Sequence, residues 1–433
     1  MVKMKDSGIE WIGEIPEKWK AVPIYTCTSE ITQKNFDLKE KRALKFTYGN
    51  IVDKNNFNID EDPALTQTAS NYLVVKPNDI VINGLNLNYD FVTQRVGMVN
   101  NNGIITSAYI GIRPNQAAVI PKYLLYLFKT YDAEKAFHNM GGGVRKILNY
   151  SELKKEKMIL PSLSQQQAII AFLDKKCEKI DKLSTQIQQE IISLRKYRKN
   201  IIAKTLTKGL DSNVSMKETG IKWIGKIPKN WKISKIKYEA DYIGSGSTPN
   251  SSNYELYDGN VFWIQSGDLY RKRAITNTQV KVTEKAIKTT SSLKIIKKDF
   301  IVIAMYGGSI GNISMSKISA CTNQAVCAIK PNKNNDIKFL YYWLSFCKDD
   351  FFRKASGGTQ PNINQIIIKN EFIPRIPLIE QEKIVNYLDD EVNLIEKIIS
   401  HKQRQQQLLK KYKHSLIYDF VTGKKQVPSV GEE

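Results

Sequence analysis

The sequence predicts an α+β protein in which two similar mixed α/β domains alternate with two long helices. Three observations lead to this fold class. A thirteen-residue phrase occurs twice, about half the chain length apart. Each copy is followed by a mixed stretch with short β-rich runs. Each mixed stretch then gives way to a long segment with a heptad pattern of apolar residues. We therefore interpret the chain as an internal duplication.

The duplicated phrase opens each half of the chain. GIEWIGEIPEKWK runs from Gly8 to Lys20, and GIKWIGKIPKNWK runs from Gly220 to Lys232. Nine of the thirteen positions are identical, and both Trp residues of each copy are among them. The whole chain holds only six Trp residues, so coincidence is a poor explanation.

The first mixed domain is expected over residues 1–160. The run from Asn71 to Asn83 predicts a strand, a Pro-Asn-Asp turn and a second strand. Another strand is expected from Gly103 to Pro114. The segment from Pro121 to Phe137 is expected to be helical, since Pro stands at its start and apolar residues follow at helical spacing.

The first long helix is expected within residues 161–210. Between Ser164 and Lys208 there is no Gly and no Pro, and Gly209 stands where a helix-ending glycine would. Such a helix would be on the order of 65 Å long, which exceeds a single-domain core, so it should pair with another helix. An isolated amphipathic helix is the alternative. The predicted seam has spacings of four and three: Leu173, Cys177, Ile180, Ser184, Ile187, Ile191, Leu194, Arg198 and Ile201.

The second half repeats this order, with a mixed domain over residues 211–375, a long helix over residues 376–423 and a tail over residues 424–433. Shifted by 215, Asn149, Gln166 and Asp174 correspond to Asn364, Gln381 and Asp389. The middles of the two mixed domains differ, since residues 243–269 have no clear counterpart in the first half. The second seam is polar in its middle: Leu388, Val392, Ile395, Ile399, Lys402, Gln406, Leu409, Lys413 and Leu416.

Composition limits the classes of function. The chain has 433 residues, 42% of them hydrophobic, and a formal net charge of +22. So basic a chain attracts polyanions, most commonly nucleic acid; a general bias toward basic residues is the alternative. The five cysteines include no CxxC pair, so neither a zinc site nor a disulfide framework is expected. No apolar leader or membrane-length run is apparent, and a cytoplasmic protein is expected.

A catalytic constellation is hard to find. No GxxxxGK[ST] loop is present, and the Gly244–Pro249 segment lacks the third glycine of a GxGxxG phosphate loop. His138, His401 and His414 are scattered along the sequence. We therefore expect no catalytic residue, no metal site and no cofactor in this chain.

Several loops instead suit contact with DNA, because they combine Gly with amide, basic and Tyr side chains. Such loops can approach phosphates closely, and Arg, Gln and Asn can contact base edges. Ordinary turns are the alternative for each loop. The basic runs at residues 195–199 and 408–414 are more simply coiled-coil flanks. The candidate DNA-binding residues are Asn83, Asn86, Asn88, Arg95, Arg145, Lys146, Ser247, Thr248, Gln265, Tyr306, Asn323, Gln324, Thr359, Gln360 and Asn362.

With these motifs the chain resembles the specificity subunit of type I restriction–modification systems over nearly its whole length. The resemblance rests on the paired WIGxIPxxW phrases, GSTP at residues 246–249, TNQA at 322–325, GGTQPNIN at 357–364 and IPLIEQEKIVNYLD at 376–389. The first half departs from the pattern. It has Gln165 and Gln166 in place of Glu-Gln, and it has no GSTP.

The resemblance implies a non-catalytic reader of double-stranded DNA. In this family two target-recognition domains each bind one half of a bipartite asymmetric site. Two long antiparallel helices separate them, as a pseudo-twofold repeat, and set the spacing. The resemblance also implies methyltransferase subunits docked on the helices and motor-nuclease subunits joining them. S-adenosylmethionine, ATP and magnesium would then act on those partners. A self-contained endonuclease or methyltransferase, and a coiled-coil scaffold without DNA binding, are the alternatives.

Overall fold

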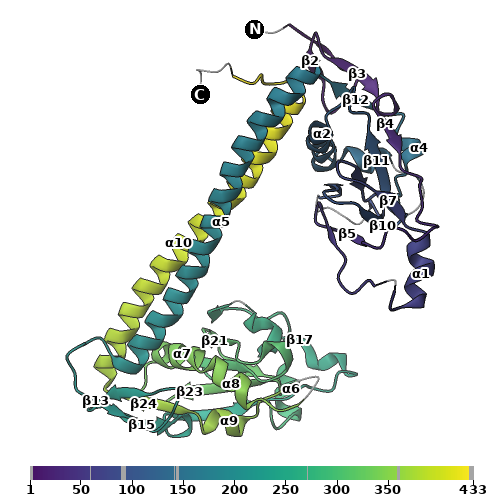
Figure 1. Cartoon of the computed structure of the whole chain (residues 1–433). Helices are drawn as coiled ribbons and strands as arrows, with labels where there is room; N and C mark the ends of the chain where they lie inside the picture. Colours follow the sequence, from purple (N-terminus) through teal and green to yellow (C-terminus); the bar gives the residue numbers. More distant parts are fainter. Residues whose placement is uncertain are drawn as a thin grey trace. The chain divides into compact units, whose positions relative to one another are not determined.

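The computed structural model describes residues 3–58, 60–88, 94–140, 142, 146–270, 272–357 and 361–428. The chain forms two compact units: unit 1 holds residues 1–188 and 403–433, and unit 2 holds residues 189–402. Two long helices, α5 (Leu163–Lys208) and α10 (Leu378–Val421), each contribute one part to each unit (Figure 1). The two long helices predicted from the heptad pattern are therefore confirmed.

Unit 1 is built around an antiparallel sheet with the strand order β4-β11-β8-β9. Short strand pairs and helices surround this sheet. The elements are β1 (Met4–Asp6), β2 (Glu14–Pro16), β3 (Lys20–Pro23), η1 (Ile24–Thr26), β4 (Thr28–Glu30), β5 (Leu44–Thr47), β6 (Asn50–Asp53), α1 (Pro63–Ser70), β7 (Leu73–Val75), β8 (Ile80–Ile82), β9 (Val96–Met98), β10 (Gly103–Ile105), β11 (Ile110–Pro114), α2 (Pro121–Ala133), α3 (Ala136–Met140), α4 (Tyr150–Leu153) and β12 (Lys157–Leu160).

Two predictions for unit 1 were wrong in detail. The run from Gly103 to Pro114 forms two strands, β10 and β11, and they pair with different partners. The helix expected from Pro121 to Phe137 breaks into α2 and α3 at Lys135, which has a φ of 61°. A non-glycine residue with positive φ cannot continue a right-handed helix, so the local backbone ends α2 despite the favourable pattern.

Unit 2 has a larger central sheet with the strand order β16-β23-β20-β21-β18 and a second sheet with the order β19-β17-β22. Its elements are β13 (Met216–Glu218), β14 (Lys226–Pro228), β15 (Lys232–Lys235), η2 (Ile236–Tyr238), β16 (Ala240–Ser245), η3 (Tyr254–Leu256), β17 (Tyr257–Ile264), η4 (Ser266–Leu269), β18 (Ala274–Ile275), β19 (Lys281–Val282), α6 (Glu284–Thr289), β20 (Phe300–Ala304), η5 (Gly307–Ser309), β21 (Ile313–Ser316), β22 (Ala320–Thr322), β23 (Val326–Pro331), α7 (Ile337–Phe346), α8 (Lys348–Lys354), α9 (Gln365–Lys369) and β24 (Phe372–Arg375).

The central sheet of unit 2 is buried on both faces, and β20 shows this most clearly. Ile301 and Ile303 pack in the core that contains α7, whereas Phe300 and Val302 pack in a core that also holds Ile264 from β17. All five residues of β20 are buried. The alternation follows from the two-residue period of a strand. Such a strand reads as a continuous apolar run in the sequence, as FIVIA does here.

The two units share part of one topology, although unit 2 has an additional strand, β18, beside β21. The order β4-β11-β8-β9 of unit 1 corresponds to β16-β23-β20-β21 of unit 2. The terminal pairs β3–β12 and β15–β24 also correspond. In unit 1 a parallel bridge joins Ala43, just before β5, to Ile104 of β10, and in unit 2 β17 pairs in parallel with β22. The strand β17, in the middle of unit 2, therefore has a partial structural counterpart in unit 1, although the two sequences differ there.

The long helices pair antiparallel through the predicted seam. Lys413 of α10 donates to Asp181 of α5 over 2.6 Å in unit 1, and Lys402 pairs with Glu190 over 2.5 Å in unit 2. Apolar seam positions such as Leu173 and Leu388 are fully buried. In the polar middle of the seam, Gln406 Nε2 donates to Gln188 Oε1 over 3.1 Å, which gives the pairing a specific register.

The duplicated phrase forms a hairpin and then meets the end of a long helix. Trp19 is 4% exposed and Trp231 is fully buried. A Cβ on Gly209, at the end of α5, would lie 3.3 Å from the Trp231 ring. A Cβ on Gly423, at the end of α10, would lie 2.9 Å from the Trp19 ring. The second copy therefore packs against the end of α5, and the first copy packs against the end of α10. Each copy contacts a long helix from the other half of the sequence.

Among the described residues, no helix combines the length and apolar character needed to cross a membrane.

All five cysteines are buried free thiols. Burial raises the pKa of Cys321 and of Cys327 to about 12, so neither is a thiolate at neutral pH. Within the described ranges, His, Cys, Asp and Glu side chains form no group of three that could hold a metal ion.

Candidate nucleic-acid interface

Five segments of unit 2 that are distant in sequence meet at one edge of its sheets. The segments are residues 246–248, the end of β17, the turn between β22 and β23, and the two loops that follow β20 and precede α9. Asn323 N donates to Ile264 O over 3.0 Å, and Met305 N donates to Ala325 O over 2.9 Å. Ile363 N in turn donates to Met305 O over 2.9 Å. We call this edge reading edge 2.

The GSTP and TNQA motifs are joined directly at reading edge 2. Gly246 N donates to the hydroxyl of Thr322 over 3.0 Å, and the Thr248 hydroxyl donates to Gln324 Oε1 over 2.7 Å. A Cβ on Gly246 would lie 2.0 Å from the Thr322 carbonyl oxygen, so only glycine allows this approach. Thr248 and Gln324 are both exposed.

The other predicted residues of this half lie at the same edge. An isolated bridge pairs Tyr306 with Asn362, and Gly307 N donates to Pro361 O over 2.9 Å. The Tyr306 side chain is 41% exposed. Gln265 directly follows Ile264, and Ser247 shares a 2.7 Å hydrogen bond with Ser292. The structure therefore brings Ser247, Thr248, Gln265, Tyr306, Asn323, Gln324 and Asn362 together. Thr359 and Gln360 lie outside the described residues.

Unit 1 builds a corresponding edge from two loops, which we call reading edge 1. The loop after β8 meets the loop before α4: Leu87 N donates to Lys146 O over 3.1 Å, and Leu148 N donates to Gly84 O over 2.9 Å. A Cβ on Gly84 would lie 2.3 Å from the Leu148 carbonyl oxygen. These contacts place the predicted residues Asn83, Asn86, Asn88 and Lys146 on adjoining loops. Arg145 lies outside the described residues.

Arg95 is a correction to the predicted set. Its side chain is only 3% exposed, and its guanidinium donates to the carbonyl oxygens of Asn83, Leu85 and Asn86. The distances to Asn83 and Leu85 are 2.9 and 2.7 Å. Arg95 therefore stabilises the conformation of the loop at reading edge 1, and its buried charge is not available to a ligand. A sequence cannot show which face of a loop an arginine occupies.

Tyr48 is a candidate that the sequence analysis missed. It stands at the tip of the β5–β6 hairpin, where it has a φ of 44° and is 77% exposed. The next residue, Gly49, would place a Cβ 3.4 Å from Gln94 and 3.6 Å from the Val96 carbonyl, so the tip lies beside Arg95. The Tyr-Gly-Asn segment between two β-rich runs was the available signal for a hairpin.

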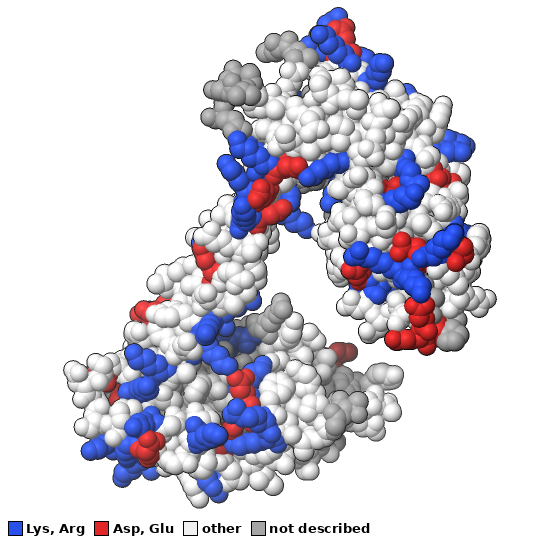
Figure 2. Space-filling view, viewed as in Figure 1, with Lys and Arg blue, Asp and Glu red and all other residues white. Residues whose placement is uncertain are grey.

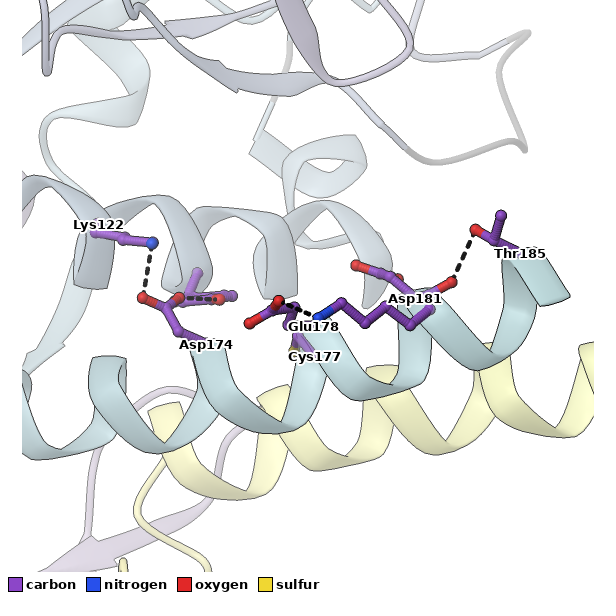
Figure 3. Close-up of a pocket in the computed structure, with 8 residues that line it drawn as sticks. Lys122, Asp174, Cys177, Glu178, Asp181 and Thr185 are labelled. Carbon is purple, nitrogen blue, oxygen red and sulfur yellow. Dashed lines mark hydrogen bonds and ion pairs between the residues drawn. The ribbon is translucent and has the colours of Figure 1, made fainter.

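The same contact joins α2 to a long helix in unit 1 and α7 to a long helix in unit 2. In unit 1 the Tyr126 hydroxyl donates to Asp174 Oδ1 over 2.7 Å, and Lys122 donates to Oδ2 over 2.6 Å. In unit 2 Tyr342 and Lys338 donate to Asp389 over 2.7 and 2.8 Å. Figure 3 shows Asp174 on α5 facing Lys122. The sequence shift that relates Asp174 to Asp389 therefore identifies equivalent residues.

Two buried glutamines repeat in the same way. Gln166 Oε1 accepts from Ile120 N over 2.8 Å, and Gln381 Oε1 accepts from Asp336 N over 2.9 Å. Both side chains are fully buried, and each binds the segment that leads into α2 or α7. The caps of α4 and α9 are likewise equivalent, since Asn149 and Asn364 accept from backbone N–H groups in the first turn.

The chemistry available at both edges is recognition. The side chains present are amides, hydroxyls and a lysine, which donate and accept hydrogen bonds or neutralise phosphates. Figure 2 shows Lys and Arg side chains spread over the visible face of unit 2, with fewer acidic groups among them. Backbone hydrogen bonds join the loops of each edge to one another. The side chains that these loops carry differ between the two units.

Comparisons with known proteins agree with this geometry. Residues 27–193 and 228–410 match the family described as the type I restriction modification DNA specificity domain. The putative type I restriction enzyme MjaX specificity subunit of Methanocaldococcus jannaschii is 26% identical over 324 residues, which are 73% of this chain and 71% of that protein. The type I restriction enzyme EcoR124I/EcoR124II specificity subunit of Escherichia coli is 27% identical over 316 residues, covering 69% and 70%.

Solved structures show the same fold. A chain in the structure described as the basis of complex assembly and conformational transition of the type I R-M system has a TM-score of 0.75 at 16% identity, covering 95% of this chain and 99% of that one. The HsdS subunit from Thermoanaerobacter tengcongensis has a TM-score of 0.55 at 16% identity, covering 95% and 98%. Since both halves match the family model over most of their length, the chain belongs to the family of type I restriction modification DNA specificity domains.

Proposed function

We propose that this chain is the DNA-reading subunit of a type I restriction–modification complex. Each unit reads one half of a bipartite, asymmetric site in double-stranded DNA through its reading edge. The observation that carries this proposal is the repetition of one frame with two different sets of exposed side chains. Because the frames place the loops equivalently while the loop residues differ, the two edges suit two different base sequences.

The chain acts without catalysing a reaction in this proposal. The described residues of the two edges supply hydrogen-bonding groups and offer no nucleophile paired with a base. Adenine-N6 methylation with S-adenosylmethionine, and cleavage with ATP and magnesium, would be carried out by partner methyltransferase and motor-nuclease subunits. Those partners would dock on the long helices, whose length would set the spacing between the two half-sites.

Exchange of one mixed domain tests the proposal. Residues 32–144 would be replaced by the equivalent segment of a relative, and the reciprocal variant would carry an exchanged second domain at residues 245–363. Methylated sites in the host genome would then be mapped for each variant. We expect each exchange to change one half-site and to leave the other half-site unaltered. If both half-sites changed together, or if purified chain alone methylated DNA, the proposal would be wrong.

A further inference from the structure

The repeat places a groove at the same position in both units, between the helix that covers the central sheet and the long helices. In unit 1 the groove lies against Lys122 and Tyr126 of α2, beside Asp174, and has a volume of about 720 Å³. In unit 2 it lies against Tyr342 of α7, next to Asp389, and has a volume of about 830 Å³. The shared contact of Tyr126 with Asp174 and of Tyr342 with Asp389 makes the two grooves equivalent.

The two grooves differ in charge. The unit 1 groove is lined by three acidic residues, Asp174, Glu178 and Asp181, and by only two lysines. Figure 3 shows these carboxylates along one side of α5. In unit 2 only two acidic residues line the groove, and six basic ones do: Arg195, Arg198, Lys199, Lys272, Arg273 and Lys348.

Part of the positive charge in the unit 2 groove is not neutralised within the protein. Arg198 pairs with Glu396, and Lys199 pairs with Asp349 over 2.5 Å. Arg273 pairs with Asp389. Within the described part of the chain, the side chains of Arg195 and Lys272 have no acidic partner, and both are exposed. Two cations in an open groove attract an anion, and the low-dielectric walls of a groove focus that field.

The unit 2 groove adjoins reading edge 2. Gly311 and Asn312 line the groove, and they belong to the loop after β20 that carries Tyr306. Lys348 from α8 fixes this loop by donating to Asn312 Oδ1 over 2.8 Å. A chain of five residues spans at most roughly 18 Å, and one DNA strand carries a phosphate about every 3.4 Å along the axis. A duplex read by Tyr306 and its neighbours would therefore pass within a few base pairs of the groove.

We propose that the unit 2 groove binds a backbone phosphate of the DNA, with Arg195 and Lys272 as the contacting cations. The inference rests on the proposed function and adds a sequence-independent contact in the second half of the chain. In the equivalent groove of unit 1, the two lysines that line it, Lys122 and Lys182, are paired with Asp174 and Glu178, so they offer a phosphate no unpaired cation. The groove would thus strengthen binding of all duplexes alike and would not take part in choosing the sequence.

The salt dependence of DNA binding tests this assignment. The double variant Arg195→Gln with Lys272→Gln would be compared with the wild-type full chain on a target duplex and on a duplex with scrambled half-sites. Loss of two phosphate contacts lowers the slope of log affinity against log salt by about 1.8. Between 50 and 200 mM salt, the variant should therefore lose roughly tenfold less affinity than the wild type. The preference for target over scrambled duplex should stay the same.

Two control variants keep the test sharp. Lys179→Gln with Lys182→Gln removes the same charge from α5 in unit 1, where Lys182 lines the groove and is paired with Glu178, and should leave the slope unchanged. Arg195→Lys with Lys272→Arg keeps the charge and should keep the wild-type slope. An unchanged slope in the glutamine variant, with wild-type DNA binding intact, would overturn the phosphate site alone. Absence of salt-dependent DNA binding by the wild type would instead overturn the proposed function.

A protein partner is the other possible occupant of the groove. Assembly of each variant with its methyltransferase subunit, measured without DNA by size-exclusion chromatography, distinguishes the two. If the glutamine variant failed to assemble and the Lys179 and Lys182 control assembled normally, the groove would be a docking surface for protein and the phosphate assignment would be wrong.

Discussion

The hydroxyl of Tyr418 donates a 3.1 Å hydrogen bond to the carbonyl oxygen of Trp11, 407 residues earlier in the chain. Nearby, the Tyr123 hydroxyl donates over 3.1 Å to the carbonyl of Val421, the last residue of α10. The end of the second long helix is thus bound into unit 1, beside the first copy of the duplicated phrase. In unit 2 the second copy meets the end of α5, where a Cβ on Gly209 would lie 3.3 Å from the Trp231 ring.

Replacing Gly423 by alanine should destabilise unit 1 strongly. Gly423 has a φ of +74°, and a Cβ there would lie 2.4 Å from Cδ of the Pro16 ring. The left-handed backbone alone costs an alanine roughly 1–2 kcal/mol, and the clash with a rigid ring adds to that cost. We expect the melting temperature to fall by several degrees, measured by differential scanning calorimetry.

Gly225→Ala is the matched control for the cost of placing alanine in a left-handed backbone conformation. Gly225 has a φ of +71°, but nothing lies within 4 Å of a Cβ built on it. This variant should show only the smaller loss from backbone strain. Equal losses in the two variants would mean that Gly423 does not need its close contact with Pro16.

Asp389 should make part of the stability of unit 2 depend on acid pH. Burial raises the pKa of this carboxyl, but hydrogen bonds from Lys338, Arg273 and Tyr342 outweigh burial and hold the pKa below its usual value. A carboxyl with a lowered folded-state pKa stabilises the fold fully above its unfolded pKa of about 3.9. That stabilisation is lost as the pH falls through the folded-state pKa.

Asp389→Asn should therefore lower stability at neutral pH, by about 2–3 kcal/mol for hydrogen bonds to a charged group. The same variant should lose less stability than wild type between pH 6 and pH 3. Thermal unfolding across this range measures both effects. Asp349→Asn, which removes an exposed pair with Lys199, should change neither property much. If the stability of Asp389→Asn fell as steeply toward acid pH as that of the wild type, Asp389 would not be the source of this pH dependence.

Lengthening both helices together should widen the gap between the half-sites. An insertion at residues 205–208 is unsuitable, because Thr205, Leu206 and Thr207 are buried and Leu206 belongs to the core of unit 2. The polar middle is the better place. Four residues would be inserted between Gln188 and Gln189 and four between Gln405 and Gln406, since Gln188 faces Gln406.

Four residues add ~6 Å to a helix, or one to two base pairs, and turn it by ~40° beyond a full turn. Mapping of methylated sites should show both half-sites unchanged and the gap longer by that amount. The insertion in α5 alone is the control. It should impair assembly, because each helix begins in the core of one unit and ends in the core of the other. An unchanged gap in an active complex would show that the helices do not set the spacing.

Much of the fold was predictable because its signals are local or repeated. The heptad seam gave the two long helices to within a few residues, since the apolar spacing and the absence of Gly and Pro act along one segment. The fixed shift between the halves related Gln166 to Gln381 and Asp174 to Asp389, and both pairs make equivalent contacts. The cofactors and the individual partners stay predictions.

Local patterns along the chain predicted a duplication with two mixed domains and two long helices, and most of the loops at the two reading edges. How those residues combine follows only from the folded chain. The contact of Thr248 with Gln324 spans 76 residues, and the burial of Arg95 depends on three carbonyl groups of its own β8–β9 connection. The different charge of the two equivalent grooves arises from residues on α2 and α5 in unit 1 and on several elements in unit 2. Such relationships depend on contacts between distant segments, and periodicity along the chain carries no record of them.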